Sequence, residues 1–277
     1  MTKQKRALAV HDISCVGRCS LTVALPVLSA AGVNTAVLPT AVLSTHTGEF
    51  TGYTNRDLSA DILPIARHWQ SLGLSFHAIY SGYLASAEQI GCILDVFDMF
   101  KREDTLILAD PVMGDNGALY AAVSMDMAAG MKRLCAKADV IVPNLTEAAF
   151  MLGESYKEDG YDKAYIESVL RKLLRIGAKS AVLTGVSFSG DRIGAAGMGV
   201  NGDMFYFDGE KAPGMFHGAG DIFASVLLAA MLNGRALDAA AKEAVDFTRR
   251  CVKLTEEMGY ERRYGAAFEL ALPYLFK

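Results

Sequence analysis

The feature that most constrains the fold of this chain is an alternation of short apolar runs with longer segments of helical spacing. The apolar runs are rich in β-branched residues and predict strands. Strands that alternate with helices form βαβ units, and these build a mostly parallel sheet covered by helices on both faces. We therefore predict an α/β fold, a three-layer αβα sandwich. The predicted strands are Ala7–His11, Thr35–Pro39, His77–Tyr80, Leu106–Ala109, Val140–Pro143 and Ser180–Thr184, and predicted helices include Ser20–Ala31, Leu58–Leu72, Ala87–Phe100 and Tyr165–Ile176.

The pattern changes after the last of these strands. Arg192–Val200 and Asp203–Asp208 flank the dipeptide Asn201-Gly202, which is typical of a hairpin with a two-residue type I′ turn. We therefore expect the sheet to end in an antiparallel hairpin.

The remaining chain has helical character from Gly218 onward, with Gly234 ending the first helix and Leu237–Glu257 forming the second. No stretch rich in Pro, Gly or Ser resembles a linker, and no internal repeat is found. We expect a single domain over residues 1–277.

Composition narrows the possible functions. The chain is 52% apolar and 21% charged, which excludes intrinsic disorder, and its net charge of −4 without a long basic run argues against nucleic acid or an anionic membrane as a partner. No apolar stretch approaches the roughly 18 residues of a membrane span, and the N-terminal apolar run is too short for a signal peptide. Five scattered cysteines indicate reduced thiols in a cytoplasmic protein, and Cys15 and Cys19 lack a second pair that would complete a zinc site.

The strongest local motif is His217-Gly218-Ala219-Gly220-Asp221, followed at once by an apolar helix. Gly218, Ala219 and Gly220 let backbone N–H groups converge at the positive end of a helix dipole, which predicts an anion hole for a phosphate. Asp221 would lie beside that phosphate and could accept a proton from an attacking hydroxyl group. The alternative is that Asp221 only caps the helix.

A second group of acidic residues follows the predicted strands. Asp110, Asp115 and Glu147 lie at carboxyl ends of strands, where open parallel sheets bind ligands, and Mg²⁺ favours carboxylates plus water. The alternative is that Asp110 starts a turn and Glu147 is a helix N-terminal charge. The chain lacks a Walker motif, and no G-x-G-x-x-G follows the first strand.

One long irregular stretch, Thr40–Arg56, interrupts the pattern. Irregular stretches of this length are usually functional or disordered. Its hydroxyl groups and His46 suit a polar ring ligand, so we predict a flap that covers a substrate; the alternative is an ordinary surface loop.

Taken together, these motifs resemble the ribokinase-like superfamily and, within it, the pyridoxal and pyridoxamine kinases. The resemblance covers most of the chain, in order: A-V-H-D-I-S-C-V-G, L-S-T-H-T, S-G-Y-L, D-P-V-M-G-D, A-D-V-I-V-P-N-L-T-E and H-G-A-G-D-I-F-A-S. It implies ATP-dependent phosphorylation of the 5′-hydroxymethyl group of a B6 vitamer (pyridoxal, pyridoxamine or pyridoxine) in the salvage of pyridoxal 5′-phosphate. It also implies Mg²⁺, a homodimer and no large lid domain, and it leaves a monovalent-cation requirement open.

The resemblance further implies a role for each matching residue. Asp221 would be the base, and Gly218, Ala219 and Gly220 would form the anion hole. The remaining roles divide by ligand: Asp110, Asp115 and Glu147 would organise Mg²⁺ and the ATP phosphates, Asn144 and Thr184 would lie on the nucleotide side with Asp110, and His46, Thr47 and Tyr83 would contact the pyridine ring.

One position departs from the family, because Asp12 stands where a serine is common. Asp12 could meet the polar edge of the ring, pairing with a cationic aminomethyl group or the ring nitrogen, which leaves the preferred vitamer open. Two other functions also stay open: a hydroxymethylpyrimidine kinase, and a non-catalytic protein that binds pyridoxal phosphate or a nucleotide on the same fold. An intact Gly218–Asp221 motif argues against the non-catalytic protein.

Overall fold

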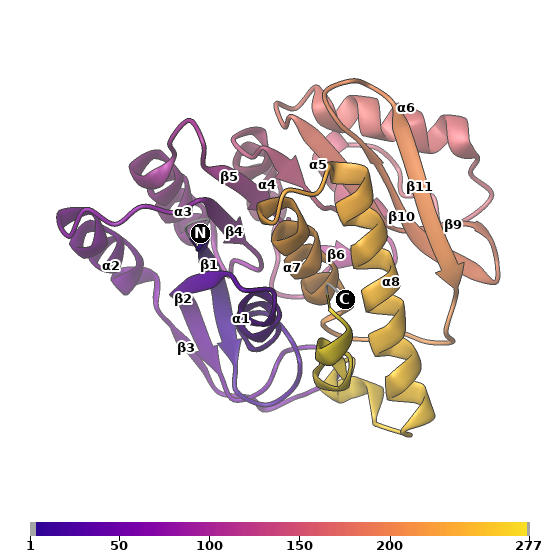
Figure 1. The fold of residues 1–277 in the computed structure, drawn as a ribbon, viewed down its shortest axis with the longest axis horizontal. Coiled ribbons are helices and arrows are strands. Elements are labelled where there is room, and N and C mark those ends of the chain that lie inside the picture. Colours follow the sequence, from indigo (N-terminus) through magenta and orange to yellow (C-terminus); the bar gives the residue numbers. More distant parts are fainter. Residues whose placement is uncertain (1–3, 276–277) are drawn as a thin grey trace.

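The computed structural model describes residues 4–275, and its central element is a nine-stranded sheet (Figure 1). In order across the sheet the strands are β11 (Met204–Glu210), β10 (Arg192–Met198), β9 (Ser180–Ser189), β8 (Val140–Ile141), β5 (Leu106–Ala109), β4 (Ala78–Ser81), β1 (Arg6–Ser14), β2 (Asn34–Leu43) and β3 (Asn55–Asp57). The six strands from β9 to β2 run parallel, whereas β10, β11 and β3 are antiparallel to their neighbours. The predicted α/β fold with an antiparallel hairpin edge is confirmed.

Helices cover both faces of this sheet. One face carries α2 (Ser59–Ser71), α3 (Ala87–Phe100), α4 (Met125–Ala136), α5 (Leu145–Leu152) and α6 (Lys163–Leu174). The other face carries α1 (Leu21–Ala30), α7 (Ala219–Leu232) and α8 (Leu237–Glu257), which pack side by side (Figure 1). Three short 3₁₀ turns, Arg262–Tyr264, Phe268–Leu270 and Leu272–Tyr274, follow α8.

The side chains of the parallel strands alternate between the two helical layers. In β1, Leu8 and Val10 face the larger core, whereas Ala7 belongs to the core under α1, α7 and α8. In β5, Ile107 and Leu108 divide in the same way. Apolar residues on both faces are what a parallel sheet between two helical layers requires, and they explain why these strands are continuous apolar runs.

The structure corrects two predictions of local conformation. The hairpin between β10 and β11 has a five-residue connection, 199–203, and Asn201 lacks the positive φ that a type I′ turn needs. A turn closed by the Gly202 N–H on the Gly199 carbonyl takes its place. The irregular stretch Thr40–Arg56 is also shorter than predicted, because its first residues extend β2 and its last ones belong to β3; we call the remaining residues 44–54 the flap.

A small two-stranded sheet, β6 (Gly114–Asp115) and β7 (Ala118–Leu119), follows the end of β5. Among residues 4–275, none of the helices combines the length and the apolar character that a membrane span requires. The carboxyl ends of the parallel strands lie along one edge of the sheet, so the loops that follow β1, β4, β5 and β8 are brought together there.

Candidate active site

The start of α7 forms an open helix N-terminus. Gly218 precedes the helix in the left-handed conformation, with φ 72°, and a Cβ atom there would collide with the Arg18 carbonyl group. Within the described part of the chain, no side chain caps this helix; Asp221 lies in its first turn and is not the capping residue. A Cβ atom on Gly220 would meet only open space. The uncapped N–H groups and the open space suit the approach of an anion.

Asp221 is partly exposed, and its Oδ2 accepts a hydrogen bond of 2.8 Å from the backbone N–H of Ser20. Loss of solvation raises the pKa of Asp221 to about 7, and the charge of Asp12 acts in the same direction, whereas the Ser20 N–H opposes the shift. A carboxylate with a pKa near neutrality can both hold and release a proton under physiological conditions, as a general base must.

Asp12 and Tyr83 lie near this carboxylate. Asp12 is buried, its Oδ2 accepts a hydrogen bond of 3.0 Å from Ser14 Oγ, and burial raises its pKa. The pKa of Tyr83 is raised by burial and by the charge of Asp12. The structure therefore brings the predicted ring contacts Asp12 and Tyr83 to the same place as Asp221.

His46 is also near the site, but both of its ring nitrogens have partners in the protein. Nδ1 accepts a hydrogen bond of 3.2 Å from the Gly48 N–H, so Nε2 carries the proton and donates to the Arg263 carbonyl at 2.6 Å. The ring also packs against Phe50 and against His217, the residue before the anion hole. His46 thus fastens the flap to the chain after α8, whereas Thr47 is exposed.

Asn144 and Glu147 form a capping box at the start of α5. Asn144 Oδ1 accepts from the Glu147 N–H at 2.9 Å, and Glu147 Oε2 accepts from the Asn144 N–H at 2.8 Å. Glu147 Oε1 also accepts from the Met113 N–H at 3.1 Å, and Asn144 Nδ2 donates to the Gly114 carbonyl at 2.8 Å. This pair ties the loop after β5 to α5. Thr184 bridges to Asn144 from β9.

Asp110 contrasts with Glu147, because it is buried and its carboxylate accepts no hydrogen bond from the described residues. Burial and the charges of Glu147 and Asp221 raise its pKa well above the ordinary value. A buried carboxylate without a donor, beside a second carboxylate, fits a divalent cation.

The Asp115 carboxylate accepts hydrogen bonds from the backbone N–H and the side-chain amide of Asn116. Its partners therefore belong to its own turn and not to the site around Asp110. Within residues 4–275, no three His, Cys, Asp or Glu side chains are arranged to hold a metal ion by themselves. A cation at Asp110 and Glu147 would therefore need ligands from phosphate oxygens and water, which is how Mg²⁺ is usually held in phosphoryl-transfer sites.

The structure adds two site residues that sequence reasoning missed, Cys19 and Ser20. The Cys19 thiol has a pKa raised well above its ordinary value by burial and by the charges of Asp221 and Asp12. Ser20 contributes only its backbone N–H. No sequence signal points to a backbone group, and Cys19 was considered only as a zinc ligand.

The fold and the comparisons with known proteins place this chain among the kinases of the ribokinase-like class. A family model described as phosphomethylpyrimidine kinase matches residues 24–266. The chain belongs to this family, and it is a phosphotransferase that acts on an alcohol group.

Three known proteins show which members of the family this chain is similar to. The pyridoxal kinase PdxY of Actinobacillus pleuropneumoniae is 30% identical over 210 residues, which cover 70% of this chain and 69% of that protein. A Bacteroides thetaiotaomicron protein assigned to the phosphomethylpyrimidine kinases and crystallised with pyridoxal is 37% identical, with a TM-score of 0.94 and coverage of 99% of this chain and 96% of that one. The pyridoxal kinase of Lactobacillus plantarum is 32% identical, with a TM-score of 0.91 and coverage of 99% and 97%. The resemblance to pyridoxal kinases is confirmed.

Proposed function

We propose that this protein transfers the γ-phosphoryl group of ATP to the 5′-hydroxymethyl group of a B6 vitamer, as one step in the salvage of pyridoxal 5′-phosphate. The observation that carries the proposal is Asp221, a carboxylate with a pKa near 7 in the uncapped first turn of α7. The relative crystallised with pyridoxal, which this chain matches over 99% of its length, supports the choice of substrate.

In this reaction Asp221 accepts the proton of the vitamer hydroxyl group as that group attacks the γ-phosphorus. Gly218, Ala219 and Gly220 provide the N–H groups that stabilise the negative charge on the transferred group. The Ala219 N–H donates to the Phe216 carbonyl at 3.3 Å in the structure, so it has to turn from that partner to reach a phosphate oxygen.

The vitamer ring lies beside Asp12 and Tyr83, with Thr47 and the flap over it. Because both nitrogens of His46 are already used within the protein, His46 acts mainly by keeping the flap in place. Asp12 supplies a carboxylate for a cationic group of the vitamer, which favours pyridoxamine or a protonated ring nitrogen.

Mg²⁺ would accompany the ATP, and Asp110, Glu147 and Asp115 are the residues that would hold it. Such an ion would supply positive charge to the phosphates during phosphoryl transfer. Asn144 and Thr184 lie on the nucleotide side. We further propose that residues 1–277 form one domain, that the protein works in the cytoplasm, and that it forms a homodimer.

The test is turnover with ATP and Mg²⁺ on pyridoxal, pyridoxamine, pyridoxine and hydroxymethylpyrimidine, measured as phosphorylated product by mass spectrometry. We expect kcat/KM for at least one B6 vitamer to exceed that for hydroxymethylpyrimidine about tenfold or more. The two kinds of ring carry different polar groups, so a site that hydrogen-bonds one of them leaves groups unpaired with the other. The family description keeps hydroxymethylpyrimidine as the second candidate. Preferred turnover of that alcohol would establish the alternative, and no turnover of any of the four would leave a binding protein.

A further inference from the structure

The loop between β1 and α1, residues 15–20, ends in an unusual backbone conformation. Ser20 has φ 52° and ψ −128°, a region that residues other than glycine seldom adopt and that costs free energy. This conformation points the Ser20 N–H at Asp221, at 2.8 Å. The rest of the structure must therefore hold the loop in place.

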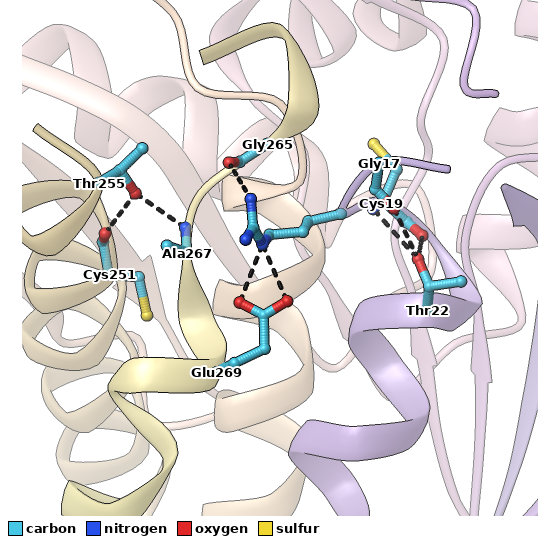
Figure 2. Close-up of polar contacts among 9 residues, drawn as sticks. Gly17, Cys19, Thr22, Cys251, Thr255, Gly265, Ala267 and Glu269 are labelled. Carbon is cyan, nitrogen blue, oxygen red and sulfur yellow. Dashed lines mark hydrogen bonds and ion pairs between the residues drawn. The ribbon is translucent and has the colours of Figure 1, made fainter. Parts of the chain in front are cut away.

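Backbone contacts supply part of that support. The Arg18 N–H donates to the Tyr264 carbonyl at 2.8 Å, and a Cβ atom on either Gly218 or Gly265 would collide with the Arg18 carbonyl oxygen. The loop thus lies between the residue that begins the anion hole and the chain after α8. On its inner side, Thr22 Oγ1 donates to the carbonyl groups of the loop, as Figure 2 shows for Gly17 and Cys19.

The Arg18 side chain adds an ion pair in which one N–H group faces both oxygens of a carboxylate. Its Nε lies 2.9 and 2.8 Å from the two carboxylate oxygens of Glu269, and its Nη1 donates to the Gly265 carbonyl at 3.4 Å (Figure 2). The guanidinium group also lies 5.6 Å from the centroid of the Tyr260 ring. All three partners belong to the chain that follows α8.

That chain is itself fixed to α8. Thr255 Oγ1, in the last turns of the helix, accepts from the Ala267 N–H at 2.8 Å and donates to the Cys251 carbonyl at 2.7 Å (Figure 2). Ala266 N–H donates to the His217 carbonyl at 3.1 Å, next to the anion hole. Glu269 therefore offers Arg18 an anchor on a rigid part of the molecule.

We propose that Arg18 and Glu269 are positioning residues for phosphoryl transfer: their ion pair fixes residues 15–20 against the chain after α8 and so keeps the Ser20 N–H on Asp221. The proposal rests on the proposed function, because it assigns a support to the base of that reaction. Neither side chain touches the reacting atoms; both act through the backbone of the loop.

The test compares Glu269→Gln and Arg18→Lys with the control Glu167→Gln, which weakens the Arg171–Glu167 pair on α6, another partly exposed arginine–carboxylate pair far from the loop. We expect kcat to fall about three- to fivefold in both loop variants, the upper part of the range that a partly exposed ion pair supports. KM for ATP and for the vitamer should stay within about twofold, and exchange of the Ser20 amide proton, followed by NMR, should become faster by a similar factor. The control should change none of these.

Two results would overturn the proposal. One is a kcat within twofold of the original protein together with unchanged Ser20 exchange in both loop variants. The other is a rise in KM without a fall in kcat, which would mean that the pair serves binding. A Ser20→Gly background gives a further check, because glycine adopts this backbone freely: the loss caused by Glu269→Gln should shrink to less than about twofold there, and an undiminished loss would contradict the mechanism. If the protein phosphorylates none of the candidate alcohols, the proposed function fails, while Ser20 exchange still tests the ion pair.

Discussion

Replacing Asp221 with asparagine separates the chemistry of this residue from its structural role. Asparagine has the same size, and its side-chain oxygen can still accept the Ser20 N–H that now bonds Oδ2 at 2.8 Å. It cannot take the proton of an attacking hydroxyl group. We therefore expect a folded protein that binds ATP and the vitamer and turns over about 10²–10⁴-fold more slowly, which corresponds to about 3–5 kcal/mol in the activation barrier.

The same change should make the protein more stable. A folded-state pKa of about 7, against the ordinary value of 3.8, means that the charged carboxylate disfavours the folded state once the pH exceeds about 4. After allowance for partial exposure, Asp221→Asn should gain about 1–2 kcal/mol in the free energy of unfolding near pH 8 and almost nothing near pH 4. Activity and stability should thus move in opposite directions.

The assay pairs kcat with the midpoint of urea unfolding at both pH values. Asp238→Asn is the matched control, because Asp238 lies exposed in the first turn of α8 and away from the site; neither quantity should change beyond experimental scatter. A nearly normal kcat in folded Asp221→Asn protein would refute the role of Asp221 as base. A loss of stability that grows with pH would refute the argument from its raised pKa.

Because Asp221 must be ionised, kcat/KM should rise with pH through about 7, and a flat profile between about pH 6 and 8 would contradict this. Glu147→Gln should lower kcat about 10²-fold and raise the Mg²⁺ concentration needed for half-maximal rate; an unchanged Mg²⁺ titration would remove Glu147 from the site. Amide hydrogen exchange in the flap, residues 44–54, should slow when a pyridoxal-like compound binds, and His46→Ala should reduce this protection. Equal exchange with and without the compound would mean that these residues do not form a flap. Among the described residues, neither ring nitrogen of the fully buried His11 has a hydrogen-bond partner, and burial lowers its pKa from 6.5 to about 3. The unfolded chain therefore binds a proton that the folded chain does not, so the contribution of His11 to stability should fall by up to about 1.4 kcal/mol per pH unit below about pH 6.5, and His11→Phe should remove this contribution in urea titrations.

Much of the fold could be predicted because buried parallel strands leave a strong signal. Their side chains face apolar layers on both sides of the sheet, so these strands appear in the sequence as continuous β-branched runs. The long helix Leu237–Glu257 could be predicted with its bounds as well. Strand β3 left no such signal, since all three of its residues are exposed. Helix α4 was missed as well. It contains Gly130, where a Cβ atom would press on Ile90 of α3, so a residue that lowers helix propensity is kept for close packing.

Only those parts of the site that consist of side chains could be predicted from the sequence. Asp221 and Asp110 were identified from their places at helix and strand ends and Asp12 from the resemblance, and the structure brings them close enough for their charges to interact. Their roles in catalysis stay predictions. His46 shows the limit of this reasoning: its place in an irregular stretch predicts a ring contact, but the sequence does not show that its Nε2 meets the carbonyl group of Arg263, a residue more than two hundred positions away.

Ser20 marks the point at which a sequence stops being informative about this site. Its contribution is an N–H group, which nearly every residue type has, and its conformation is set by partners such as Arg18, Gly218 and Gly265 that are distant in sequence. Each of these residues has an ordinary local explanation: Ser20 as the start of a helix, Gly265 as a turn, Arg18 as a surface charge. Only their packing against one another reveals that the base has a support, and this is why the Arg18–Glu269 pair could be inferred from the structure alone.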